Sequence, residues 1–238
     1  MLCVPSVSAV EVALQQGVDG YMGTEDTVIF EDHADNAIGG QDSILSGSTA
    51  LSVRRALIRF DLTGLPATLE VESASLTLEL NQSSLEAASP EPFTLHRLTS
   101  DWGEGEVFVE DEIGMGAPAA MGDATWRSNF HGVSEWSTVG GGGDFIPSAS
   151  ASQFIGEFDQ IDPLENLQVF SGPLLAEDVR GWLASPEENF GWILVGRENA
   201  IRTARRFNSS ETLSGQAPRL VINGEMPSEG IANGLSLR

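Results

Sequence analysis

The sequence predicts an all-β protein, an antiparallel β-sandwich or barrel with one short helix and long loops. Three observations support this prediction: short runs of alternating apolar and polar residues, frequent Gly, Pro, Asn and Ser between these runs, and a single segment with helical spacing. Of the 238 residues, 41% are hydrophobic, 26 are Gly and 11 are Pro. This composition is sufficient for a packed core and favours one large domain.

The clearest strands are predicted over residues 55–62 and 74–80. In each segment apolar and polar residues alternate, so one face is expected in the core and the other in water. Weaker runs of this kind occur at 10–14, 27–31, 93–98, 167–170, 192–195, 204–207 and 219–223. The residues predicted to be buried between two sheets are Ala56, Ile58, Phe60, Leu62, Leu76, Leu78, Leu80, Trp192, Leu194 and Leu220.

A helix is predicted only over residues 174–184. Leu175, Val179, Trp182 and Leu183 form an apolar stripe at helical spacing, and Pro186 is expected to end the helix. Trp182 and Trp192 are assigned to the core. The region from about 103 to 162 lacks regular patterning, which predicts long loops on the sandwich.

The chain divides into three predicted parts. Residues 1–9 end in Val7, Ser8 and Ala9, small residues typical of a signal-peptide cleavage site, so they are interpreted as the remnant of a secretion signal with few contacts. A native N-terminal segment is the alternative. Residues 10–224 form the sandwich, and residues 225–238 are a C-terminal tail. We therefore expect a secreted, extracellular protein without a membrane span.

Charge and cysteine content exclude several classes of function. Twelve Arg, no Lys and 35 acidic residues give a net charge of −23. Nucleic-acid binding is not expected, because affinity for phosphate backbones depends on abundant Lys and Arg. The single cysteine, Cys3, excludes an intramolecular disulfide and a multi-cysteine zinc site.

A set of segments within residues 10–224 shows a further pattern. They are RRALIRFDLTGLP (54–66), SASLTLEL (73–80), LHRLTSDWGEG (95–105), GAPAAMGDATW (116–126), WSTVGGGGDFIPSASA (136–151), DVRGWLASPEENFGWIL (178–194), ARRFNSSE (204–211) and APRLVI (217–222). In this order they resemble the DNRLRE-domain family, which is related to disaggregatase repeats and to certain carbohydrate-binding modules. The resemblance implies a jelly-roll-like form of the antiparallel β-sandwich, extracellular and accompanying polysaccharide-degrading or surface-attached proteins, with glycan binding in some relatives.

Arginines are concentrated in two short stretches, 54–59 and 202–206. Pairing of the two strands would bring Arg55, Arg59, Arg202 and Arg206 onto one cationic face. Guanidinium groups bind carboxylates and sulfates bidentately, so such a face predicts a site for an acidic polysaccharide. The alternative is that these arginines form ordinary ion pairs with acids, for which Asp61, Glu198 and Glu211 are available.

Aromatic residues offer a second route to sugar binding. Trp126 and Trp136 lie in the irregular region among polar neighbours, where exposed rings would stack on pyranose faces. Burial of the two rings, which would fix the loop to the sheet, is the alternative and follows the general trend for large aromatics.

A structural calcium is the one cofactor considered. Asp32, Asp35 and Asn36 form the first oxygen-rich stretch, and residues 110–112 form a second. Neither has EF-hand spacing, and calcium needs six to eight oxygens, so adjacent acids alone do not define a site.

Support for catalysis is weak. The sequence contains neither HExxH nor a Gly-x-Ser-x-Gly elbow. Acidic residues are abundant, and among them Asp101 and Glu104 beside Trp102 would be the choice for a carboxylate pair, with a solvated turn as the alternative. We therefore predict a non-catalytic module that binds extracellular polysaccharide or attaches to a matrix. A structural building block that self-associates through protein contacts is the alternative, and a glycan-cleaving enzyme is a weaker one.

Overall fold

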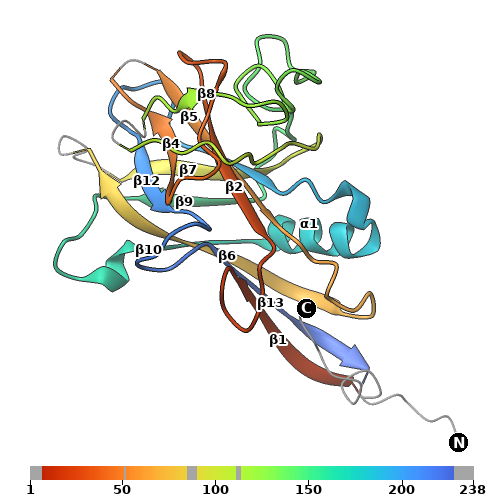
Figure 1. Ribbon diagram of the computed structural model, residues 1–238. Coiled ribbons are helices and arrows are strands. Elements are labelled where there is room, and N and C mark those ends of the chain that lie inside the picture. Colours follow the sequence, from red (N-terminus) through yellow and green to blue (C-terminus); the bar gives the residue numbers. More distant parts are fainter. Residues whose placement is uncertain (1–6, 51, 85–89, 111–113, 228–238) are drawn as a thin grey trace, which may run out of the picture.

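The computed structural model describes residues 7–50, 52–84, 90–110 and 114–227 (Figure 1). Its strands are β1 Val7–Gln15, β2 Thr24–Phe30, β3 Asn36–Ala37, β4 Ser43–Ser48, β5 Val53–Phe60, β6 Glu70–Ser83, β7 Glu91–Arg97, β8 Ala117–Pro118, β9 Ala151–Ile155, β10 Leu167–Ser171, β11 Trp192–Val195, β12 Arg205–Asn208 and β13 Arg219–Pro227. The helical segments are η1 Pro163–Asn166, α1 Pro173–Ala184 and η2 Pro186–Glu188. The all-β class is confirmed.

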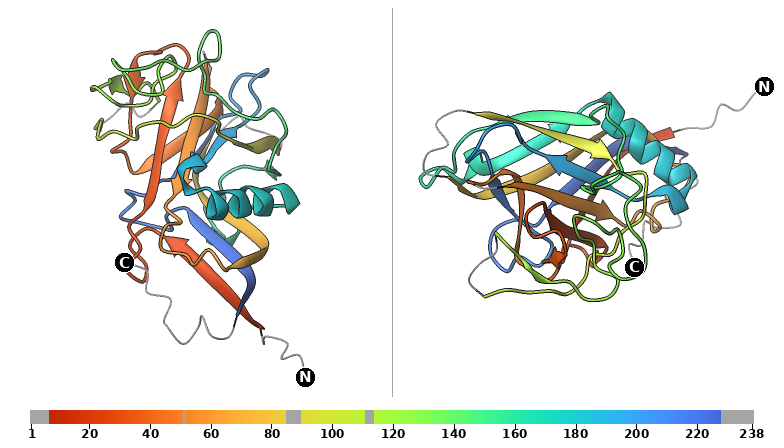
Figure 2. Two further views of the ribbon diagram at one scale, coloured as in Figure 1. Left: turned by 90° about the vertical axis from the view of Figure 1, so that its right-hand side faces the viewer. Right: turned by 90° about the horizontal axis from the view of Figure 1, so that it is seen from above.

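The strands form one continuous antiparallel sheet that curls into two layers. Its order is β1-β13-β6-β12-β4-β5-β11-β7-β9, with β10 added to β6 and β2 added to β5. Strand β4 belongs to both layers, because residues 43–46 pair with β12 and residues 47–48 pair with β5. Gly47 lies between these two parts at φ +107°, and a side chain there would meet the Cα of Ala204 at 2.9 Å. The result is a jelly-roll-like sandwich (Figure 2).

The main core fills the space between the layers. All ten residues predicted to lie there are buried, which confirms the alternation in both clear strands. Phe93 and Phe207 meet edge to face with ring centroids 6.0 Å apart, and each comes from a different layer. Burial of this apolar surface is the dominant stabilising contribution to the fold.

A second, smaller core lies on the outer face of β2, β5 and β11. Leu57, Ile29 and Ile193 contact Trp102 and Trp136 from the irregular region, and all five are buried. The expectation that the Arg55–Arg59 face of its strand is wet is therefore wrong. Leu57 lies between these two arginines on the same face, and the loops cover it to remove its side chain from water.

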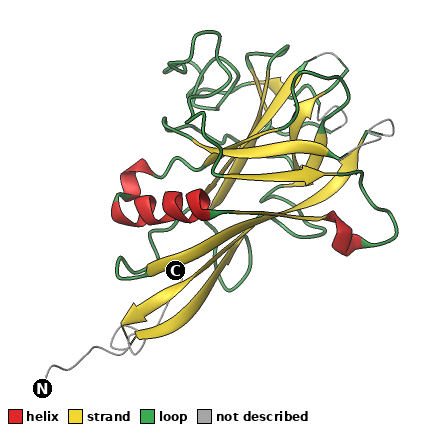
Figure 3. Cartoon of the chain, turned by 180° about the vertical axis from the view of Figure 1, so that it is seen from behind, coloured by secondary structure: helices red, strands yellow, loops and turns green. Residues whose placement is uncertain are grey.

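The helix was placed correctly, and the strand bounds differ by a few residues. Helix α1 packs against β6 at one side of the sandwich and buries Leu175, Val179 and Trp182 (Figure 3). Strands β3, β4, β8 and β9 have no counterpart among the predicted strands, and β8 and β9 lie inside the region predicted to form loops.

The sheet extends beyond both predicted domain boundaries, residues 10 and 224. Residues 7–9 belong to β1 and pair with residues 225–227 of β13, so they are not a segment with few contacts. Main-chain ladder bonds extend both strands beyond the boundaries expected at 10 and 224. The remainder of the expected signal segment, residues 1–6, and residues 228–238 of the expected tail lie outside the described residues.

Candidate functional site

A cavity between α1 and the ends of β2 and β5, which we call the Arg59 groove, has a volume of about 650 Å³. It is lined by Arg59 of β5 and by residues within 22–25, 61–67 and 182–189. The last segment is the end of α1 and the turn that follows it, so the helix forms one wall and the ends of β2 and β5 form the other. The lining mixes aliphatic groups with carboxylates, an amide and a guanidinium.

Arg59 is held by two carboxylates. It forms an ion pair with Glu25 and donates to Asp101 at 2.5 Å, and its guanidinium lies 5.0 Å from the Trp102 ring centroid. Burial alone would lower the pKa of Arg59, but Glu25 and Asp101 outweigh burial and raise it. Together with Asp61, these acids give the groove a net negative charge, which disfavours an anionic ligand.

Two polar atoms in the groove wall lack an intramolecular hydrogen-bond partner. They are Nε1 of Trp182 and Oδ1 of Asn189. The other amide atom of Asn189 donates to the Phe60 carbonyl at 2.8 Å, which fixes the side chain beside β5. Both atoms are closed off from solvent, so hydrogen bonds to a ligand in the groove would come from exposed groups such as the side chains of Asp61 and Thr63.

Trp182 packs against Trp192, which in turn forms a hydrogen bond with Asp178 of the same helix as Trp182. Its ring packs against Trp192 with centroids 4.5 Å apart, and Trp192 Nε1 donates to Asp178 Oδ2 at 2.8 Å. Ser150 donates to the same oxygen at 2.5 Å. Burial raises the pKa of Asp178, and these two hydrogen bonds partly oppose that effect.

Arg55 has a separate environment under the loops. Its guanidinium binds Glu198 bidentately, with N–O distances of 2.6 and 3.0 Å, and donates to the Gly142 carbonyl at 2.6 Å. It also lies 5.0 Å from the Trp126 ring centroid. For Arg55 the predicted alternative of an ion pair with Glu198 is confirmed. Arg59 also forms ion pairs, although with Glu25 and Asp101.

The direct pairing of the two arginine-bearing strands is not observed. Strand β4 separates β12 from β5, and Arg202 lies before β12 in a turn, at φ 61°. The sequence pattern cannot show that a third strand intervenes. Arg202 and Arg206 instead line a cavity of about 390 Å³, which we call the Arg206 hollow. Arg206 donates to Asn81 Oδ1 at 2.7 Å.

Two arginines of the same stretches are structural. Arg54 is 2% exposed, binds Asp32 at 2.8 Å and donates to the Gly114 carbonyl. Arg205 is fully buried and donates to the carbonyls of Gly156 and Ile155 beside β9. Part of the arginine content of the two stretches therefore serves to bind carbonyl and carboxylate groups inside the protein.

The two candidate tryptophans have different surroundings. Trp136 is 5% exposed and donates to the Thr125 carbonyl, so the buried alternative is confirmed for this residue. Trp126 is half-buried, donates to the Gly140 carbonyl at 3.0 Å and packs beside Arg55. Neither lines the Arg59 groove.

The predicted calcium residues each have protein contacts. Asp32 binds Arg54 and His33, and Asp35 lies 3.5 Å from Arg127. Asn36 donates to the Met115 carbonyl. These contacts lend no support to a shared ion, and calcium binding there stays a prediction. Most of the second stretch, at 111–112, lies outside the described residues.

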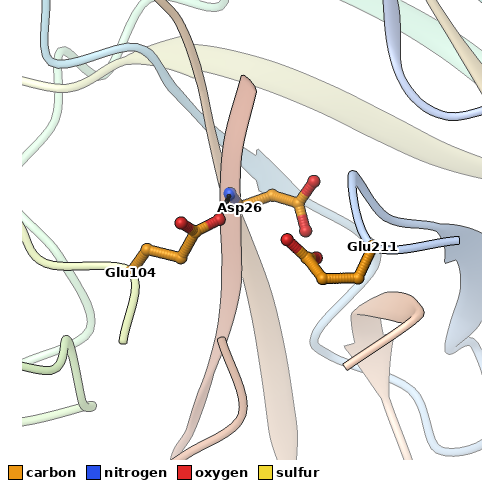
Figure 4. A group of neighbouring side chains, drawn as sticks. All are labelled: Asp26, Glu104 and Glu211. Carbon is orange, nitrogen blue, oxygen red and sulfur yellow. Dashed lines mark hydrogen bonds between the residues drawn. The ribbon is translucent and has the colours of Figure 1, made fainter. Parts of the chain in front are cut away.

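A cluster of three carboxylates lies elsewhere, at the unpaired edge of β2 (Figure 4). Asp26 is 1% exposed, its N–H donates to Glu104 Oε1 at 2.6 Å, and the Ser210 N–H donates to its Oδ2 at 2.7 Å. Burial, followed by the charge of Glu211, raises the pKa of Asp26. Burial also raises the pKa of Glu104 to about 8 and that of Glu211 above its ordinary value.

The sequence pattern does not predict this carboxylate cluster. Glu104 was expected only as the partner of Asp101 in a carboxylate pair, whereas Asp101 binds Arg59. One signal was present: in β2, Asp26 occupies the same face as the buried Val28 and Phe30. A carboxylate on an apolar strand face requires a compensating partner.

Comparisons with models of known protein families and with curated proteins give no match for this chain. None of the helices in the described ranges has the length and apolar character needed to cross a bilayer.

Proposed function

We propose that this protein is a secreted, non-catalytic module that binds polysaccharide in the Arg59 groove. The observation that favours this function is the composition of the groove wall. Apolar surface from Met22 and Leu183 lies beside exposed hydrogen-bonding groups such as the Asp61 carboxylate and the Thr63 hydroxyl. Sugars present both apolar ring faces and hydroxyl groups that donate and accept, so they match such a lining.

The charges of the groove favour a neutral glycan. Arg59 already has two carboxylate partners, so it is poorly placed to bind a third on a uronate. Carboxylates such as Asp61 accept hydrogen bonds from sugar hydroxyls. An acidic glycan would fit better at the Arg206 hollow, which is lined by Arg202, Arg206 and the buried Arg205. The Arg59 groove is therefore expected to bind neutral glycans and the Arg206 hollow acidic ones, so binding experiments can distinguish the two cavities.

Two matched substitutions separate these cavities. Ala67→Trp fills the Arg59 groove, and Ala50→Trp fills the Arg206 hollow; both alanines are exposed and line their cavities. Neutral and acidic polysaccharides would be screened by array and the hits titrated by calorimetry. We expect wild type and Ala50→Trp to bind neutral polysaccharide equally, and Ala67→Trp to bind at least ten-fold more weakly. Undiminished binding by Ala67→Trp, or binding lost only in Ala50→Trp, would contradict the assignment to the groove.

A second candidate function is self-association as an adhesive building block. Phe154 on β9 is 70% exposed, and Leu164 is 71% exposed in the same shallow depression of about 360 Å³. Strand β9 ends the sheet path in the described structure, so its edge is available for pairing. Light scattering of wild type and Phe154→Ser distinguishes this candidate, which requires an oligomer that the substitution dissociates.

A further inference from the structure

The carboxylate cluster has dimensions suited to one bound ion. Asp26, Glu104 and Glu211 come from β2, from the loop after β7 and from the loop after β12, yet one oxygen of each lies within 4.8 Å of the others. Calcium binds oxygens at 2.3–2.6 Å, so ligands on opposite sides of the ion are roughly 5 Å apart. All three oxygens can therefore contact a single calcium ion.

A second observation points to a missing positive partner. Oδ1 of Asp26 has no hydrogen-bond donor although the residue is 1% exposed, and Figure 4 shows its carboxylate directed toward Glu211. Oε2 of Glu211 also lacks a partner. Within the described ranges, the ion pairs involve none of the three carboxylates. Buried charges without such compensation are strongly unfavourable.

We propose that Asp26, Glu104 and Glu211 bind one calcium ion. The donor set consists of oxygens, which hard divalent cations prefer, and calcium tolerates irregular geometry with additional ligands from water or carbonyl groups.

The ion would connect three segments that are distant in sequence. The Asp26 N–H donates to the Glu104 carboxylate, which joins β2 to the loop of Glu104, and the Ser210 N–H donates to the Asp26 carboxylate, which joins β2 to the loop of Glu211. Calcium would replace the repulsion between the carboxylates with attraction to a common centre. Glu25 projects to the opposite side of β2 from Asp26, toward Arg59, so the ion site and the groove share a strand without sharing ligands.

The test compares calcium binding by the whole protein and two kinds of variant. Chelator-treated wild type, Asp26→Asn and Glu211→Gln would be titrated with calcium chloride by calorimetry and melted with and without calcium. Asp35→Asn is the control, because it removes one acid from the surface pair with Arg127 and leaves the cluster intact. Circular dichroism would verify that every variant folds.

We expect one calcium per chain in wild type and Asp35→Asn, and a Tm increase of roughly 5–10 °C at a hundred-fold excess over Kd. In Asp26→Asn and Glu211→Gln, one-site binding should be lost and the Tm increase should fall below about 1 °C. The proposal is overturned if wild type shows no stoichiometric binding, or if both cluster variants retain it. Loss of binding in Asp35→Asn alone would place the site at the Asp32 stretch and would also refute it.

Discussion

Removal of the Asp178 carboxylate should destabilise the protein through the two donors that it leaves behind. Trp192 Nε1 and the Ser150 hydroxyl both donate to Asp178 Oδ2, and all three residues are buried. A buried donor without a partner costs about 1–3 kcal/mol. Asp178→Ala also removes the cost of burying a carboxylate, so we expect a net loss of about 2–4 kcal/mol.

In a protein of this size such a loss corresponds to a Tm decrease of roughly 5–15 °C. Asp178→Asn retains one acceptor oxygen and carries no charge, so its loss should be about 1 kcal/mol at pH 7. Thermal melts and denaturant titrations monitored by circular dichroism measure both values. Because Trp192 supports Trp182, Asp178→Ala should also weaken binding in the Arg59 groove.

The pH dependence gives an independent check. Burial raises the pKa of Asp178 above its ordinary value of 3.8, so its contribution to stability is complete below that value and declines as pH rises through the raised pKa. The stability of Asp178→Asn relative to wild type should therefore improve between pH 4 and pH 7. The reasoning is refuted if Asp178→Ala melts within 1 °C of wild type, or if its effect is additive with that of Trp192→Phe in a double-mutant cycle.

Two further predictions concern the loops. Burial of Asp144 disfavours its ionisation, but hydrogen bonds from Thr138 and its neighbours outweigh burial and lower the pKa. Asp144→Asn should cost about 1–3 kcal/mol at pH 7, and melts should show this difference shrinking as pH falls below 3.8, because the ionised form is the stabilising one. Gly191 has φ +74°, and a Cβ there would lie 2.2 Å from the Ile58 carbonyl oxygen. Gly191→Ala should lower the Tm by several degrees, whereas the control Gly156→Ala, with no atom within 4 Å, should melt like wild type.

Local patterning identified the strands with alternating apolar residues and failed where small polar residues are buried. The segment 74–80 alternates large apolar and polar side chains, and the structure places it within β6. Strand β4 has the sequence SILSGS, and its serines are buried although their composition is typical of a loop. Ser46 donates to the Leu194 carbonyl at 2.8 Å, a long-range contact that a single sequence does not reveal.

The candidate sites are harder to predict from sequence than the strands, because they are assembled by the order of the strands in the sheet. Glu104 is 78 residues from Asp26 in the chain, so no spacing rule could connect them. The arginine prediction required the order of the strands, which places β4 between β5 and β12. The acid at position 26 on an apolar strand face was the one local indication of the cluster. An acid on an otherwise apolar strand face is therefore a residue whose surroundings should be inspected first when a site is sought.

Strand β4 belongs to both layers, so the two sides of the sandwich should differ in how strongly they resist separation of the layers. On the β4 side, separating the layers requires rupture of the backbone ladders to β12 and β5. On the other side, β9 and β10 are neighbours in space without pairing as strands. Slow subglobal opening should therefore begin at β9 and β10, and amide protons of β4 should be among the last to exchange with solvent. A partner that inserts a strand would enter at β9 without disturbing the shared strand.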